Sequence, residues 1–132
     1  MADIIHTILH ANLLIGWIGM LAGVISGSII GLFFHRDEWL GGYASFPRRM
    51  VRLGHISFFG LGFLNILFAL TLSLVPPDAS LARIASWGFI LGAVTMPLCC
   101  YLCAWRKRLW ILFPIPVAGL LAGVCAFLWG WQ

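Results

Sequence analysis

Four long apolar stretches constrain the fold of this chain more than any other feature. They cover residues 4–34, 53–75, 81–104 and 109–131. Each is long enough to cross a bilayer as a helix, which takes about 20 residues. None alternates between apolar and polar residues, as the strands of a membrane barrel do. The sequence therefore predicts an all-α integral membrane protein, a single domain over residues 1–132 whose four transmembrane helices run up and down.

The composition supports a lipid environment. Of the 132 residues, 62% are apolar and only 9% are charged, and the mean hydropathy is +1.03. A soluble domain carries about a quarter charged residues. The net charge of +4 comes from short basic clusters at the ends of the apolar stretches, so we expect contact with lipid and not with nucleic acid. No acidic residue lies inside a stretch, which argues against a hydrolase and a proton-driven transporter.

The basic residues predict the orientation in the membrane. Seven of the eight Lys and Arg residues lie in or beside the loops at 35–52 and 105–109, and only Arg83 lies near the loop between them. Cytoplasmic loops carry the excess of Lys and Arg. We therefore expect both basic loops to be cytoplasmic and both termini to lie on the outer (periplasmic) side, most simply in a bacterial inner membrane.

Small residues recur four positions apart on three of the predicted helices. The pairs and runs are Gly19, Gly23, Gly27 and Gly31, then Gly88 and Gly92, then Gly119 and Gly123. In lipid, such spacing lets helix backbones approach closely. The alternative is that the glycines clear space for a flat cofactor or a lipid tail. Asn65, in the middle of the second stretch, is expected to form a hydrogen bond across the bundle.

Two histidines form the strongest cofactor candidate. His35 ends the first predicted helix and His55 lies about one turn inside the start of the second, at similar depth near the cytoplasmic side. Neighbouring helices could supply one axial ligand each to a haem b, with Arg48, Arg49 and Arg52 pairing the propionates. A quinone headgroup held by His55 and an arginine is an alternative. The histidines could also be structural groups at the membrane interface.

The other two histidines, His6 and His10, lie one helical turn apart at the outer end. An i, i+4 pair can bind one metal ion from one face of a helix. It cannot bind both faces of one haem, although His10 is the next candidate for a haem ligand. The alternative is that both are solvated interfacial residues.

A third candidate is the stripe of sulfur atoms in MPLCCYLC. Met96, Cys99, Cys100 and Cys103 are spaced i, i+3, i+4 and i+7, which places them on one side of a helix. Thiolate and thioether are soft ligands that favour copper as Cu(I). The alternative is ordinary packing by small and flexible apolar side chains. The spacing is not that of a secreted disulfide scaffold, so we expect all the cysteines to be reduced.

The first predicted helix resembles that of the membrane-bound protoporphyrinogen oxidase family. The shared residues are His10, Trp17, Gly19 and the terminal His35. The likeness is confined to this stretch. The charged Pro-Arg segment of that family is missing and the spacing to His35 differs, so no functional residue is carried over.

Two classes of function follow from these patterns. The first is a small redox subunit of electron transport, similar to a b-type cytochrome, that binds haem or quinone near the cytoplasmic side between the first two helices. The second is a non-catalytic accessory subunit or self-assembling scaffold. The sequence does not decide whether the protein is an enzyme. A bundle of 14.6 kDa buries little surface by itself, so we expect other membrane subunits or copies of the chain as partners.

Overall fold

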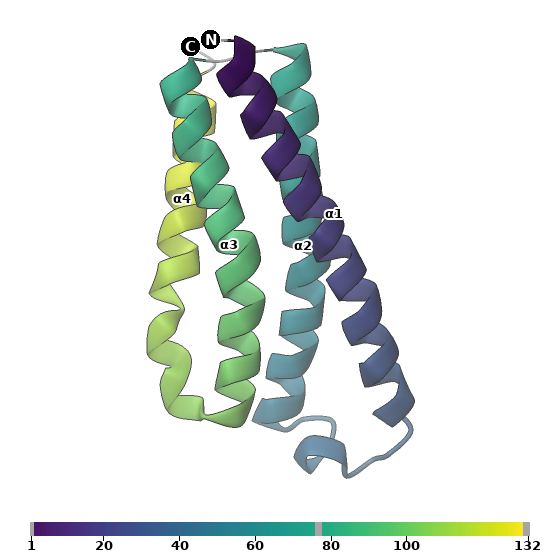
Figure 1. Ribbon diagram of the computed structural model, residues 1–132. Coiled ribbons are helices and arrows are strands. Elements are labelled where there is room, and N and C mark those ends of the chain that lie inside the picture. The colour runs from purple at the N-terminus through teal and green to yellow at the C-terminus, as the bar shows by residue number, and fades with distance from the viewer. Residues whose placement is uncertain (1, 76–77, 131–132) are drawn as a thin grey trace.

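The computed structural model describes residues 2–75 and 78–130. The predicted all-α, up-down arrangement is confirmed (Figure 1), and the described chain holds four helical segments long and apolar enough to cross a membrane, the last of them Lys107–Trp129. The elements are α1 (Ala2–Phe33), α2 (Phe46–Leu74), α3 (Ala79–Trp105) and α4 (Pro114–Trp129), with the short 3-10 helices η1 (Trp39–Gly41) and η2 (Lys107–Leu112). We call the end that holds both chain termini the terminal end, and the opposite end, with η1 and η2, the basic end.

Helix α2 begins at Phe46, about two turns earlier than the sequence predicts. Ser45 is its N-cap and accepts a hydrogen bond from the Arg48 amide at 3.3 Å, and Pro47 lies in the first turn, where its missing N–H costs nothing. The prediction treated the charged residues as part of the loop. Arg48, Arg49 and Arg52 in fact occupy the first turns of a helix whose charged end extends beyond its apolar run.

Helix α4 begins at Pro114, five residues later than predicted. Residues 107–112 form η2, and α4 starts with a proline at its first position. Proline lacks the amide hydrogen that a preceding turn would need. An apolar run through Pro114 therefore does not continue as one α-helix. The predicted end of this helix at residue 131 lies outside the described residues.

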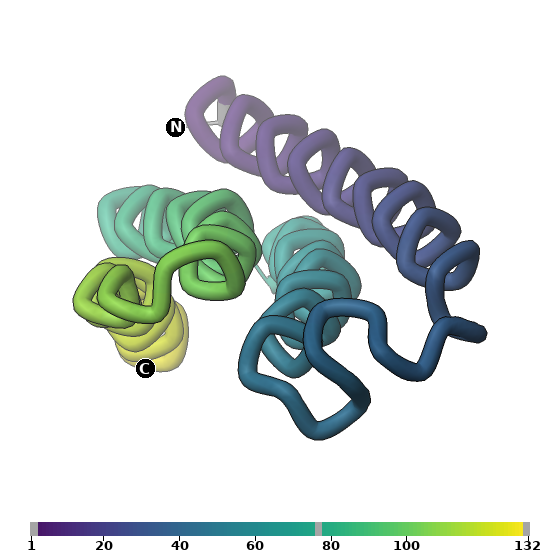
Figure 2. Tube along the Cα trace, turned by 90° about the horizontal axis from the view of Figure 1, so that it is seen from below, coloured from purple at the N-terminus to yellow at the C-terminus, as the bar shows by residue number. Residues whose placement is uncertain are grey.

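The helices pack in sequence order. Each helix lies against the next, α1 also contacts α3, and α4 lies on the side of α3 that faces away from α1 (Figure 2). Near the terminal end, rings from three helices meet. Phe68 of α2 contacts Phe89 of α3 and Phe127 of α4, with centroids 4.9 and 5.3 Å apart. Phe68 and Phe89 belong to the buried core toward the terminal end, and the partly buried Phe127 packs against it.

The glycine pattern accounts for the close helix contacts. A Cβ atom added to Gly23 or Gly27 of α1 would collide with side chains of α2. A Cβ atom added to Gly88 of α3 would meet the backbone of Gly119 and Gly123 of α4. Gly31 differs, because no other element of the described chain comes within 4 Å of an added Cβ atom. Packing therefore explains most of the pattern, as the small-residue spacing predicts.

Two buried amides tie the bundle together. Asn65, which is fully buried, donates to the carbonyl oxygens of Leu61 at 2.8 Å and of Phe89 on α3 at 3.2 Å. This confirms the predicted hydrogen bond across the bundle. Asn12, also fully buried, donates to Ser86 Oγ at 2.5 Å and so joins α1 to α3. In each amide the nitrogen is paired, which lowers the cost of burial, whereas the side-chain oxygen has no partner in the described residues.

Candidate functional site

A polar cluster of three side chains from three helices lies toward the basic end. His55 of α2 places its Nδ1 atom 3.1 Å from the Oγ atom of Ser26 on α1. Tyr101 of α3 lies beside the same serine. We call Ser26, His55 and Tyr101 the three-helix cluster. It is the one place where the described contacts join polar side chains of α1, α2 and α3 around a histidine.

Glycines on α1 and α2 allow this approach. His55 sits against Gly27, where an added Cβ would lie 2.5 Å from the His55 Cε1 atom. On its other side His55 contacts the edge of Phe59, with centroids 5.3 Å apart. Tyr101 lies against Gly54, where an added Cβ would be 3.0 Å from the tyrosine ring. The missing side chains let the imidazole and the phenol pack directly on neighbouring backbones.

A hydrogen bond joins His55 to α1 through Ser26. Ser26 donates its hydroxyl hydrogen to the Gly23 carbonyl at 3.0 Å. With that bond in place the serine oxygen can only accept, and the tautomer of His55 that fits carries its hydrogen on Nδ1. In that tautomer the Nε2 atom keeps its lone pair. His55 can then offer Nε2 as an acceptor or a metal ligand.

The hydroxyl group of Tyr101 is the unsatisfied member of the cluster. Its oxygen is buried and has no hydrogen-bond partner in the described part of the chain, although Ser26 lies close by. A buried hydroxyl without a partner costs about 1–3 kcal/mol. Tyr101 can therefore donate to a bound molecule that brings an acceptor into the cluster.

A small apolar cavity lies one helical turn toward the terminal end from the cluster. It has a volume of about 170 Å³ and is lined by residues of α1, α2 and α3, among them Ala22, Phe58 and Val94. Ala22 precedes Ser26 by four residues, which places both on the same face of α1. Phe58 also contacts the Tyr101 ring, with centroids 6.2 Å apart. An apolar space and a set of polar groups therefore adjoin between the same three helices.

His35, the predicted partner of His55, does not face it. It is exposed and lies in the turn after the end of α1. His55 contacts Gly27, and eight residues separate Gly27 from His35, which corresponds to about 12 Å along a helix. The depths of the two histidines therefore differ, and the structure does not place them as axial ligands of one haem, which need to stand at the same level.

Arg48 is bound to the loop rather than free to pair a cofactor. Its guanidinium group donates to the carbonyl oxygens of Phe34 at 3.2 Å and Asp37 at 3.2 Å, and the side chain is 3% exposed. It also lies between aromatic rings, 5.6 Å from the Trp39 centroid and 5.5 Å from that of Tyr43. Arg48 thus caps the carbonyl groups left open after the end of α1.

The other two arginines at this end have different environments. Arg52 lies over the Tyr43 ring at 4.3 Å and donates to the Tyr43 carbonyl at 3.4 Å. Arg49 is exposed. The described contacts bring neither side chain to His55. The predicted propionate or headgroup role of the three arginines therefore has no support in this geometry.

The predicted metal ligands lie in two separate places, on α1 and on α3. His6 and His10 are exposed neighbours on α1, with ring centroids 5.1 Å apart. Cys99, Cys100 and Cys103 are buried free thiols, and Cys125 is a free thiol as well, as expected. Within the described residues, no group of three His, Cys, Asp or Glu side chains is close enough to hold a metal ion. For Cys100, contact with α2 beside Gly54 indicates a packing role.

Comparison with protein-family models, curated proteins and solved structures found no match to this chain. The site must therefore be interpreted from its own geometry.

Sequence reasoning identified His55 and missed its two partners. Ser26 was not singled out, and Tyr101 lies among the cysteines of MPLCCYLC. One signal was available, because Tyr101 is the lone tyrosine within the apolar stretches and the other tyrosine lies in a loop. A phenol at that depth requires a partner or a function.

Proposed function

We propose that the protein is a small membrane redox subunit that binds a quinone headgroup at the three-helix cluster. The observation that carries the proposal is the buried Tyr101 hydroxyl, which lacks a partner within the described residues and lies near a histidine that is hydrogen-bonded to Ser26. When bound, the quinone would supply the redox chemistry. The chain itself would hold and orient the ring and keep it away from water.

The polar groups match both redox forms of a quinone. A quinone carbonyl oxygen accepts hydrogen bonds, and the Tyr101 hydroxyl can donate one. A quinol hydroxyl donates, and a His55 tautomer with its hydrogen on Nδ1 can accept at Nε2. The cavity beside Phe58 and Val94 supplies an apolar wall for the ring and the start of its tail.

The proposal extends to orientation. The basic end would face the cytoplasm of a bacterial inner membrane, because seven of the eight Lys and Arg residues lie there. Two exposed positions, Ala44 at the basic end and Ser80 at the terminal end, allow a test. Ala44→Cys and Ser80→Cys are made in a background without the native cysteines. A membrane-impermeant thiol reagent added to intact spheroplasts should label the second variant and not the first. The opposite pattern would reverse the orientation.

Binding is tested with decylubiquinone added to the purified protein, followed by quenching of tryptophan fluorescence. We expect saturable binding that Tyr101→Phe and His55→Gln each weaken about tenfold, the size of one buried hydrogen bond. Tyr43→Phe and His35→Gln are the matched controls and should bind like the wild type. Equal binding by all four variants would refute the site.

An absorption spectrum separates quinone from haem. A Soret band that shifts on reduction with dithionite would show a haem, and its loss in His55→Gln would assign that haem to α2. Quinone binding without such a band supports the quinone site.

A second candidate is the accessory or scaffold role, in which the cluster only packs the helices. Two glycines that do not pack against another described helix favour this role. Gly31 of α1 and Gly60 of α2 have no heavy atom of the described chain within 4 Å of an added Cβ. If they contact copies of the chain or other subunits, Gly31→Leu and Gly60→Leu should change the size of the detergent-solubilised complex. Unchanged size, together with quinone binding, would exclude this role for these faces.

A further inference from the structure

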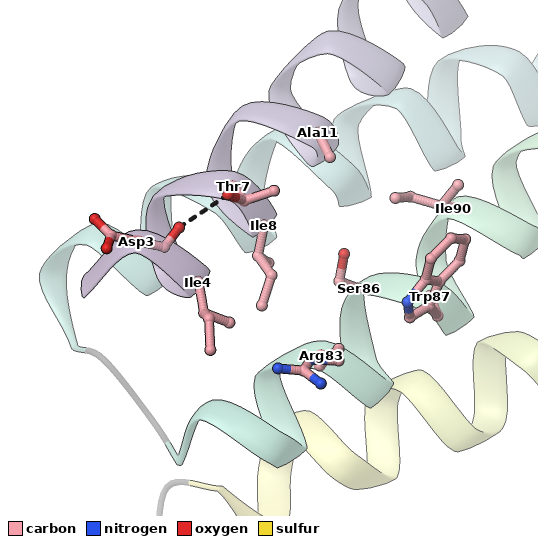
Figure 3. A pocket seen from close by; sticks show the side chains of 9 residues that line it. All are labelled: Asp3, Ile4, Thr7, Ile8, Ala11, Arg83, Ser86, Trp87 and Ile90. Atoms are coloured by element: carbon pink, nitrogen blue, oxygen red, sulfur yellow. Dashed lines mark hydrogen bonds between the residues drawn. The ribbon is translucent and has the colours of Figure 1, made fainter. Parts of the chain in front are cut away.

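A second and larger cavity lies between α1 and α3 at the terminal end, far from the three-helix cluster. Its volume is about 390 Å³, within the range of about 300–1,000 Å³ typical of small-molecule sites. Figure 3 shows Ile4 and Ile8 of α1 pointing toward α3 across this space, with Ile90 deeper along α3. The interior wall is therefore apolar.

Two opposite charges stand at the mouth of this cavity. Asp3 lies on the first turn of α1, and Arg83 lies near the start of α3. Both are exposed, and neither side chain forms an ion pair or hydrogen bond within the described residues. A charged residue at the end of a membrane helix lies at the level of lipid headgroups. The mouth therefore offers a separate anion-binding and cation-binding group.

Polar groups also lie where the apolar wall meets the mouth. Ser86 lines the cavity and is 5% exposed, and its Oγ atom accepts a hydrogen bond from Asn12. Its own hydroxyl hydrogen reaches no acceptor in the described part of the chain. Trp87, which is exposed beside it, can donate from its indole nitrogen. Two donors therefore face the depth at which a phospholipid carries its ester carbonyls.

We propose that this cavity binds one zwitterionic phospholipid whose headgroup carries a primary ammonium. The phosphate pairs with Arg83 and the ammonium with Asp3. Ser86 or Trp87 donates to an ester carbonyl, and an acyl chain lies against Ile8 and the other apolar residues. The charge pattern selects this class, because Asp3 repels a headgroup with a net negative charge. A trimethylammonium group has no hydrogen to donate to Asp3.

The experiment uses the full chain in micelles that contain equal amounts of phosphatidylethanolamine, phosphatidylcholine and phosphatidylglycerol with identical acyl chains. Native mass spectrometry then measures the lipid retained. We expect the wild type to retain phosphatidylethanolamine about threefold more than either other lipid, the size of one partly exposed charge pair. Arg83→Gln should lower retention of all three, and Asp3→Asn should abolish the preference for the primary amine.

Matched controls are exposed charges at the basic end. Arg49→Gln and Asp37→Asn remove the same charges elsewhere and should leave the lipid pattern unchanged. Retention of no lipid, retention without discrimination, or a preference for phosphatidylglycerol would overturn the proposal. A preference that persists in Asp3→Asn would do so as well. Because all four positions are exposed, the variants are expected to fold, which size-exclusion chromatography confirms independently.

Discussion

Substitution of Gly88 by alanine is the sharpest test of how the bundle is held together. Gly88 of α3 faces α4 at its closest approach. An added Cβ would meet the carbonyl oxygen of Gly119 and would lie 2.8 Å from the Cα atom and 2.9 Å from the nitrogen of Gly123. Carbon atoms in good contact stand about 3.5–4.0 Å apart. All three obstacles are backbone atoms, so no change of side-chain rotamer relieves the clash and the helices must separate by about 1 Å.

The cost follows from this separation. A gap of about 0.5–1 Å forfeits a quarter to a half of the dispersion energy of each contact that it opens. Overpacking of this kind costs about 1–3 kcal/mol. Alanine also favours the helix over glycine by up to about 1 kcal/mol, which offsets part of the loss. We expect Gly88→Ala to lower the free energy of unfolding by about 2 kcal/mol, or about thirtyfold in the folding equilibrium.

The control is Gly60→Ala, because Gly60 of α2 has no heavy atom of the described chain within 4 Å of an added Cβ. Both variants are titrated with SDS in mixed micelles, and near-ultraviolet circular dichroism reports the loss of tertiary packing. The midpoint of Gly88→Ala should fall well below that of the wild type, and the midpoint of Gly60→Ala should stay or rise. Coincident midpoints for the two variants would refute the close approach of α3 and α4.

Three further predictions test the loop anchor, the buried amide and the site. Arg48→Lys should lower stability by about 2 kcal/mol in the same titration, because lysine lacks the planar fork that reaches two carbonyl groups, whereas Arg49→Lys should have no effect. Asn65→Ala should cost about 1–2 kcal/mol through the lost bond between α2 and α3, and amide exchange should rise along both helices. Gly27→Ala should displace His55 from Ser26 and weaken decylubiquinone binding severalfold, while the same change at Gly31 leaves binding intact.

Much of the fold followed from local patterns. Long apolar runs can only be helices in lipid, because every backbone amide must bond within its own segment. The turns between the apolar runs were also predictable from their residues. Asp78 is an example, because an aspartate is a common N-cap and it caps α3 by accepting from the amides of Ser80 and Leu81. Two predicted helix starts were wrong. Helix α2 begins earlier, at Phe46, because its first turns carry charged residues, and α4 begins later, at Pro114, because of its proline.

The candidate site was predictable only in part. His55 stands out because an ionisable side chain at the edge of an apolar stretch is rare. Its predicted neighbours were chosen by depth, and depth along the sequence did not reveal which faces meet. The role of Arg48 was not predictable for the same reason. A cation near a histidine in the sequence suggested a cofactor contact, whereas the folded structure shows its bonds to the carbonyl groups of Phe34 and Asp37.

The sequence alone therefore determined how many segments are long and apolar enough to cross a membrane, where they turn and that glycine brings them close. Only the tertiary structure decided which faces meet. Gly27 and Gly31 repeat one pattern on α1, yet the first holds His55 and the second faces open space. Periodicity describes one helix at a time, whereas contact depends on how neighbouring helices are rotated and tilted. For that reason Ser26, His55 and Tyr101, from three distant segments, became a site only in the folded bundle.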